Sequence, residues 1–203
     1  MKRCLLPKSS KVIDAAHLLQ SANLFLSVND RLSAIKCVEL ADFDSIRERT
    51  EKLWGKRNPI IHKVFKVQSG PPLLPKQERV PVRMPSSEER ANLIARDGYH
   101  CRFCETALIP AEVRKEFVRL FPELSLWGRK NSEQHAAFQG MWLQFDHILP
   151  HSRGGDNNIG NIVVTCAPCN FARMEFTLDE LGLENPLAHN PFRSDWDGLT
   201  RML

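Results

Sequence analysis

The sequence of 203 residues contains no long uninterrupted hydrophobic run. No stretch approaches the roughly 18 consecutive apolar residues that suggest a membrane-spanning helix. The basic N-terminal residues are followed by only two leucines, Leu5 and Leu6, which are too few for the core of a signal peptide. We therefore expect a cytoplasmic protein without a membrane association. Internal repeats and low-complexity runs are also missing, and the composition is not that of a disordered chain.

The composition is that of a globular protein, with 42% hydrophobic and 26% charged residues. A chain of this length forms one domain, or one domain with an appendage, and can bury a sizeable core. The net charge of +4 is unevenly distributed. Residues 1–90 hold 17 Lys and Arg against 10 Asp and Glu, whereas residues 91–203 hold 11 against 14. A basic first half is compatible with a polyanionic partner, and also with an ordinary solvated surface.

Four of the six cysteines form two C-x-x-C pairs, at residues 101–104 and 166–169, while Cys4 and Cys37 stand alone. Disulfides are rare in a reducing cytosol. Paired cysteines at this spacing are typical of a tetrahedral zinc site, and the alternative is a set of buried thiols without a metal. The 61 residues between the pairs exceed the usual spacing, so we expect an insert between them.

Composition and periodicity divide the chain into three regions. Apolar residues recur at helical spacing in the first region, which predicts helices over about 29–40 and 42–54, the second capped by Asp42. The three regions are residues 1–57, a helical N-terminal region; residues 58–85, a proline-rich basic linker or arm; and residues 86–203, a domain with an insert at about 105–143 and a C-terminal tail.

The arm is rich in proline, and we expect one strand over 60–67 followed by an extended segment. Its positive residues are Lys63, Lys66, Lys76, Arg79 and Arg83. Residues 1–84 are expected either to grip DNA or to dock onto a protein partner.

The third region carries signals of both helix and strand. Ser86 or Ser87 can cap a helix that ends at Gly98. The remaining expected elements are helices over 110–120, 132–139 and 170–174, strands over 141–149 and 162–165, and a tail that packs through Trp196, Leu199 and Leu203. The insert is either a helical cap that packs through Trp127, Phe138 and Trp142 or an element of substrate recognition.

The residues that can carry chemistry lie between 144 and 170. Asp146 and His147 end a strand, and alternation directs neighbouring side chains to opposite sides, so that one can face a metal and the other a water. Asn161 opens the return strand and Asn170 follows the last cysteine. Carboxylate and amide oxygens suit Mg²⁺, and a neutral imidazole can accept a proton near pH 7. A metal with a base is the equipment for hydrolysing a phosphodiester.

Three stretches, residues 96–104, 146–155 and 161–170, closely resemble the HNH endonuclease family. They are similar to the first cysteine knuckle, the catalytic strand and turn, and the second strand and knuckle of that family. The resemblance covers about residues 88–178. It implies an α+β fold with a ββα-metal core (the HNH or His-Me finger), a helical N-terminal region and a helical insert. It also implies a structural Zn²⁺ held by Cys101, Cys104, Cys166 and Cys169.

The resemblance also implies a role for each polar residue. His147 would be the general base, and Asn161 would pin the loop and hold the backbone near His147. Asn170 stands where the family often has histidine, and with Asp146 it would bind a catalytic Mg²⁺ or Mn²⁺. Many members carry lysine where this chain has Met174. The residues expected to contact phosphate, unless they are ordinary surface arginines, are Arg96, Arg153 and Arg173.

The function implied is metal-dependent hydrolysis of DNA to 5′-phosphate and 3′-hydroxyl ends, in bacterial defence, restriction or mobile-element biology. Two alternatives are a nuclease subunit active only within a larger complex, docked through residues 1–84, and a non-catalytic zinc-ribbon module that binds nucleic acid. The intact set of Asp146, His147, Asn161 and Asn170 argues against the non-catalytic module. Target sequence, preference for DNA or RNA, strand number and oligomeric state are left open.

Overall fold

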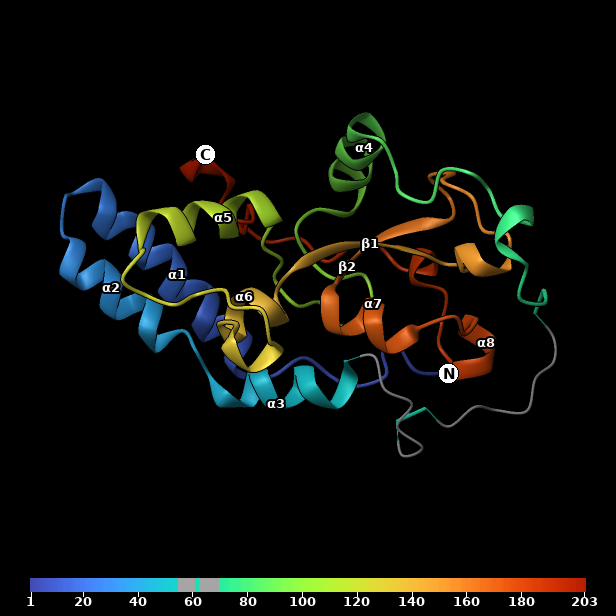
Figure 1. Cartoon of the computed structure of the whole chain (residues 1–203), viewed down its shortest axis with the longest axis horizontal. Helices are drawn as coiled ribbons and strands as arrows, with labels where there is room; N and C mark the ends of the chain where they lie inside the picture. The colour runs from blue at the N-terminus through green and yellow to red at the C-terminus, as the bar shows by residue number, and fades with distance from the viewer. Residues whose placement is uncertain (55–60, 63–69) are drawn as a thin grey trace.

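The computed structural model describes residues 1–54, 61–62 and 70–203. Within these residues, helices surround one two-stranded antiparallel sheet (Figure 1), which confirms the α+β class. The helices are α1 (Lys11–Ser27), α2 (Arg31–Leu40), α3 (Asp44–Leu53), α4 (Ser87–Asp97), α5 (Ala111–Leu120), α6 (Ala136–Gly140), α7 (Ala167–Arg173) and α8 (Leu178–Leu181). The strands are β1 (Leu143–His147) and β2 (Ile162–Cys166), and short 3-10 turns include η1 (Lys76–Glu78), η2 (Asn131–Glu133) and η3 (His151–Arg153).

Helices α1 and α2 form an antiparallel pair at one end of the molecule (Figure 1). The buried face of α1 follows helical spacing and contains several alanines, which allow close approach of the neighbouring helix. Asp30 caps α2, because its carboxylate accepts a hydrogen bond from Ser33 N at 3.1 Å. The buried residues of α1 are Val12, Ala15, Ala16, Leu19 and Ala22.

Helix α3 begins two residues later than the sequence predicts, with Phe43 at the N-cap, so the prediction that Asp42 caps it is wrong. The Asp42 carboxylate instead accepts hydrogen bonds from Ala136 N at 2.6 Å and from the Arg47 guanidinium at 2.7 Å. Asp42 therefore ties the start of α3 to the start of α6. A hydrogen bond to the distant residue Ala136 thus takes the place of the predicted capping bond.

The insert packs against the N-terminal helices. Phe117, Phe121 and Phe138 are buried in the same core as Leu19 and Ile46. Trp127 and Trp142 meet edge to face with ring centroids 5.7 Å apart, and the Arg114 guanidinium lies 3.7 Å and 4.8 Å from the two centroids. The insert and the N-terminal helices thus form one helical half of the molecule.

The other half, which we call the hairpin half, is built from α4, β1, β2, α7 and α8 (Figure 1). Ser86 caps α4 through a reciprocal bond pair with Glu89, as predicted, and the helix ends at Gly98 with φ +72°. The strands pair in the register Leu143↔Cys166 to His147↔Ile162. Helix α7 follows β2 directly and packs on both strands.

Both ends of the chain pack on the body. Lys2 N donates to Gly182 O and Glu184 N donates to Lys2 O, each at 3.0 Å. In the tail, Trp196 Nε1 donates to Leu108 O at 2.9 Å and Leu199 is buried. The prediction that Leu203 also packs is wrong, since 69% of it is exposed.

Other boundaries shift in ways that local chemistry explains. The predicted helix at 132–139 is divided into η2 and α6. Helix α7 begins three residues earlier than predicted, because Pro168 is favourable in a first helical turn. The strand predicted at 60–67 lies outside the described residues, apart from Ile61 and His62. In the described part of the chain, no helix is both long and apolar enough to cross a bilayer.

Candidate active site

The four cysteines of the two C-x-x-C pairs meet in one buried cluster. Their sulfur atoms all lie within 4.8 Å of one another, and Cys104 Sγ is 3.6 Å from Cys166 Sγ. Zn–S bonds of about 2.3 Å in a tetrahedron place the sulfurs about 3.8 Å apart. The cluster therefore fits a tetrahedral zinc ion in both ligand type and spacing. Its members are Cys101, Cys104, Cys166 and Cys169.

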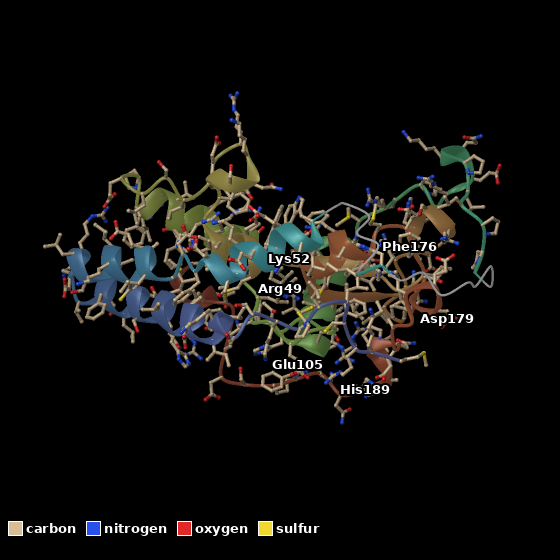
Figure 2. All side chains as sticks on the ribbon, turned by 90° about the horizontal axis from the view of Figure 1, so that it is seen from below. Arg49, Lys52, Glu105, Phe176, Asp179 and His189 are labelled. Carbon is tan, nitrogen blue, oxygen red and sulfur yellow. The ribbon has the colours of Figure 1, made fainter. Side chains whose placement is uncertain are left out.

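A buried arginine from the helical half contacts this cluster. Arg49 lies on α3, is 8% exposed, and its guanidinium approaches Cys169 Sγ at 3.7 Å. The same guanidinium donates to Pro7 O at 2.5 Å and to Leu6 O at 3.1 Å. In Figure 2, Arg49 is labelled on the α3 ribbon where the two halves meet. Its positive charge partly offsets the negative charge of thiolates in the cluster.

At the far end of the hairpin, β1 opens into a cleft of about 740 Å³. Asp146, His147 and Asn170 line this cleft together. Alternation along β1 predicts that the side chains of Asp146 and His147 point to opposite sides of the strand. Both residues nevertheless line the same cavity at the end of the strand. Three of the four polar residues singled out from the sequence thus meet in one place.

His147 is held by a residue that sequence analysis missed. Its Nε2 lies 3.0 Å from Asn157 Oδ1, and Asn157 Nδ2 donates to Val82 O at 3.1 Å. The bond to Val82 fixes the amide orientation, so Oδ1 faces the imidazole. Because an amide oxygen only accepts, Nε2 carries the proton and Nδ1 keeps its lone pair. Burial lowers the pKa of His147 from its ordinary value of 6.5, while the bond to Asn157 opposes that effect.

Asn161 pins the turn between the strands. Its Oδ1 accepts from Leu149 N at 2.8 Å, and its Nδ2 donates to Leu149 O at 3.3 Å and Asp156 O at 2.9 Å. Ile148 N also donates to Asn161 O at 2.7 Å. The turn is tight: a Cβ on Gly155 would lie 1.9 Å from Leu149 O. These bonds hold the backbone that follows His147, and Asn161 does not line the His147 cleft.

Asp146 is paired with Arg173 rather than free. Arg173 Nη2 and Nε lie 2.6 Å and 2.7 Å from the two carboxylate oxygens, and both side chains are buried. Arg173 also donates to the carbonyl oxygens of His147, Ile148 and Phe176. An ionised carboxylate offers about four lone-pair positions, so a bidentate arginine leaves positions for a cation. Asp146 and Asn170 thus remain a fitting hard-donor set for Mg²⁺ or Mn²⁺.

The three arginines expected to contact phosphate are all engaged inside the protein. Arg173 binds Asp146 as described. Arg96 pairs with buried Asp97 at 2.7 Å and donates to Ile159 O and Ile162 O. Arg153 pairs with Glu180 at 3.0 Å and donates to Glu175 O and Pro71 O. These intramolecular partners occupy the guanidinium groups that the predicted phosphate contacts would need.

The cleft has a second side that comes from the arm. Lys76, Arg79 and Arg83 of the arm line the cleft together with the strand residues. His151 Nε2 donates to Val80 O at 2.8 Å, which attaches the arm to the turn after β1. The arm's basic residues were noted in the sequence, but no sequence signal connects them to His147. Lys63 and Lys66 lie outside the described residues.

Comparison with known proteins finds a family match within the hairpin half. Residues 136–183 match the model of a family described as HNH endonuclease. Searches of curated proteins and of solved structures found no match. The matched residues contain β1, β2, α7, the second cysteine pair and the four polar residues. The resemblance inferred from the sequence is confirmed over residues 136–183, which are similar to the HNH endonuclease family and suggest a nuclease of the HNH type.

Proposed function

We propose that the chain is a metal-dependent HNH endonuclease that hydrolyses DNA phosphodiester bonds. The observation that carries the proposal is the cleft itself. It brings together an imidazole with a free Nδ1, a carboxylate and an amide oxygen, and it adjoins basic residues. Under this proposal β1, β2 and α7 are the ββα-metal core of the family.

His147 acts as the general base. Asn157 holds the proton on Nε2, which leaves Nδ1 to accept a proton from water. The resulting hydroxide attacks phosphorus and the bond to the 3′-oxygen breaks, which gives 5′-phosphate and 3′-hydroxyl ends. Asn161 acts indirectly by fixing the backbone after His147. Asn157 is likewise a positioning residue.

Asp146 and Asn170 are the residues that would hold Mg²⁺ or Mn²⁺ in the cleft. A cation there supplies charge stabilisation to the phosphate and to the leaving oxygen. Arg173 orients the Asp146 carboxylate through its bidentate contact. The four-cysteine cluster is the structural Zn²⁺ site, closed to solvent and formed entirely from protein ligands.

The test is cleavage of supercoiled plasmid by the purified, zinc-loaded chain, with and without added Mg²⁺ or Mn²⁺. We expect nicking only with added metal. His147→Ala removes the base and should lower the rate by about 10²–10⁴-fold, the usual contribution of general-base catalysis. His17→Ala is the matched control, because His17 is exposed on α1 and remote from the cleft.

Two results would contradict the proposal. Cleavage by His147→Ala at the wild-type rate would exclude His147 as the base. No cleavage by folded, metal-supplied wild-type protein would favour a subunit that needs a larger complex, or a module that binds nucleic acid without cutting it. DNA binding measured in parallel separates these two alternatives from a general loss of function.

A further inference from the structure

Residues 71–84 of the arm are bound along the turn that follows β1. Leu74 N donates to Ser152 O at 2.8 Å. His151 and Asn157 donate to the carbonyl oxygens of Val80 and Val82 at 2.8 Å and 3.1 Å. The contacts follow the arm over nine residues, and Figure 1 shows it beside η3 at the edge of the hairpin half. The position of the arm relative to His147 is therefore set by hydrogen bonds to the turn itself.

The composition of the arm suits this extended course. Proline lacks a backbone N–H and favours extended conformations, so the arm forms few bonds with itself and presents its carbonyl oxygens to the turn. One internal bond is from Arg79 Nε to Leu74 O at 2.9 Å. The prolines of this segment are Pro71, Pro72, Pro75 and Pro81.

Three cations of the arm face the cleft with their charges available. Lys76, Arg79 and Arg83 all line it. Among the described residues, no hydrogen bond or ion pair engages the Lys76 ammonium or the Arg83 guanidinium. Arg79 uses only Nε, so its two terminal nitrogens remain as donors. This availability distinguishes the arm from Arg96, Arg153 and Arg173.

The spacing of these cations matches a phosphate backbone. Four residues of extended chain separate Arg79 from Arg83, which is at most about 13 Å. One strand of DNA presents a phosphate about every 3.4 Å of helix rise, so this length exceeds the rise between successive phosphates. Arg79 and Arg83 can therefore meet different phosphates of one strand. Lys76 lies at the start of the same wall.

We propose that the arm is the second wall of a nucleic-acid groove, in which Lys76, Arg79 and Arg83 bind the phosphates flanking the bond placed at His147. The inference rests on the proposed nuclease function and assigns its phosphate contacts to residues outside the segment that matches the family model. The arm binds the substrate through these cations. It is also connected to the base, because Asn157 bonds both His147 and Val82.

The experiment measures binding of a fluorescent DNA duplex by anisotropy, without added divalent metal, over a range of NaCl concentrations. The test variant is Lys76→Gln/Arg79→Gln/Arg83→Gln. If each cation contacts one phosphate, the slope of log K against log salt falls by about 2.7, at about 0.9 per contact. Affinity at low salt should fall by at least about tenfold, in line with the loss of several phosphate contacts.

The matched control removes the same charge elsewhere. Lys115→Gln/Arg129→Gln/Lys130→Gln changes three exposed cations that do not line the cleft. We expect its salt slope and affinity to stay close to wild type. Circular dichroism melts of both triple variants check that neither loses its fold, since the three arm side chains are at the surface and only Arg79 makes an internal bond.

Each outcome decides the question. An arm variant with wild-type affinity and slope overturns the inference, and so does one that binds or cuts DNA better, because that would make the arm a cover over the cleft. Equal losses in both triple variants would show a general charge effect and also overturn it. A wild-type protein that fails to bind DNA overturns it as well. A wild-type protein that binds DNA through the arm but does not cut it leaves this inference standing while the proposed function fails.

Discussion

The four-cysteine cluster and the His147 cleft share one seven-residue helix, α7, in which the cluster residue Cys169 is followed directly by the cleft residue Asn170. The cluster is buried, contains only sulfur ligands and leaves no position for a substrate. The cleft is open and is lined by an imidazole, by residues with oxygen donors and by cations. Closed sites with four protein ligands are structural, whereas reactive sites keep positions for water and substrate. Under the proposed function, α7 therefore carries a structural site and a reactive site on adjacent residues.

The largest expected effect is a loss of stability at the four-cysteine cluster. Cys166→Ser removes one of four metal ligands, and structural zinc contributes roughly 10 kcal/mol or more to the folding of small zinc domains. We expect loss of bound zinc and unfolding of the hairpin half, measured by elemental analysis and circular dichroism.

Cys37→Ser is the control for that experiment, because Cys37 packs in the helical half away from the cluster. It should keep zinc and fold. A Cys166→Ser protein that retains one zinc per chain and melts with the wild type would remove the structural role assigned to the cluster.

The next largest effect is expected at the ion pair of Asp146 and Arg173 beside the cleft. Arg173→Leu leaves the buried Asp146 carboxylate without its partner, which typically costs about 3–5 kcal/mol. Urea unfolding measures this loss. Replacing both partners, as in Arg173→Leu/Asp146→Leu, should recover only part of the stability, because the carbonyl oxygens bound by Arg173 stay without their donor, and should recover none of the cleavage. Cleavage by the double variant would exclude Asp146 as a metal ligand.

A smaller effect is expected in the turn. Asn161→Ala removes three side-chain hydrogen bonds and leaves part-buried backbone groups of Leu149 without partners, which costs about 1–3 kcal/mol. Asn161→Asp keeps the acceptor for Leu149 N but loses both donors, so it should fall between Ala and wild type. Equal unfolding free energies for all three proteins would show that Asn161 does not hold the turn.

The smallest effect is expected at His135, which lies outside both the cysteine cluster and the cleft. Burial lowers the pKa of His135 from its ordinary value of 6.5, and its Nε2 bonds Val38 O at 2.9 Å. The unfolded chain therefore takes up this proton first as the pH falls. Stability should be independent of His135 above about pH 6.5 and should decline below it. His135→Gln should flatten the acid side of the profile, whereas the same change at exposed His17 should not.

Much of the hairpin half could be predicted because its signals are local in sequence. The cysteine pairs, Asp146 with His147, and Asn161 each occupy a short stretch with a definite order. The Ser86 cap of α4 is also local and was predicted correctly. Spacing alone predicts each cysteine pair and the helix cap, whereas the roles of Asp146, His147 and Asn161 follow from the resemblance to the HNH family.

The predictions that failed depend on distant partners. Asp42 looks like a helix cap until Ala136 N, far along the chain, takes its carboxylate. The phosphate contacts of Arg96 and Arg153 stay predictions, and the fold shows that these guanidinium groups also pair with neighbouring Asp97 and with distant Glu180. Asn157 and Arg49 were missed for the same reason, since their partners come from other elements. The grouping of the insert with the N-terminal helices likewise arises from tertiary packing.

The pairing of Lys2 with residues 182 and 184 also has a consequence for synthesis of the chain. The N-terminal segment leaves the ribosome first, yet the backbone it bonds is made about 180 residues later. At about 5–20 residues per second, that interval is roughly 10–40 s. The cysteine cluster must likewise wait for Cys169, and the helical core for Leu199. During translation, the pairing of Lys2 therefore waits until residues 182 and 184 have been made.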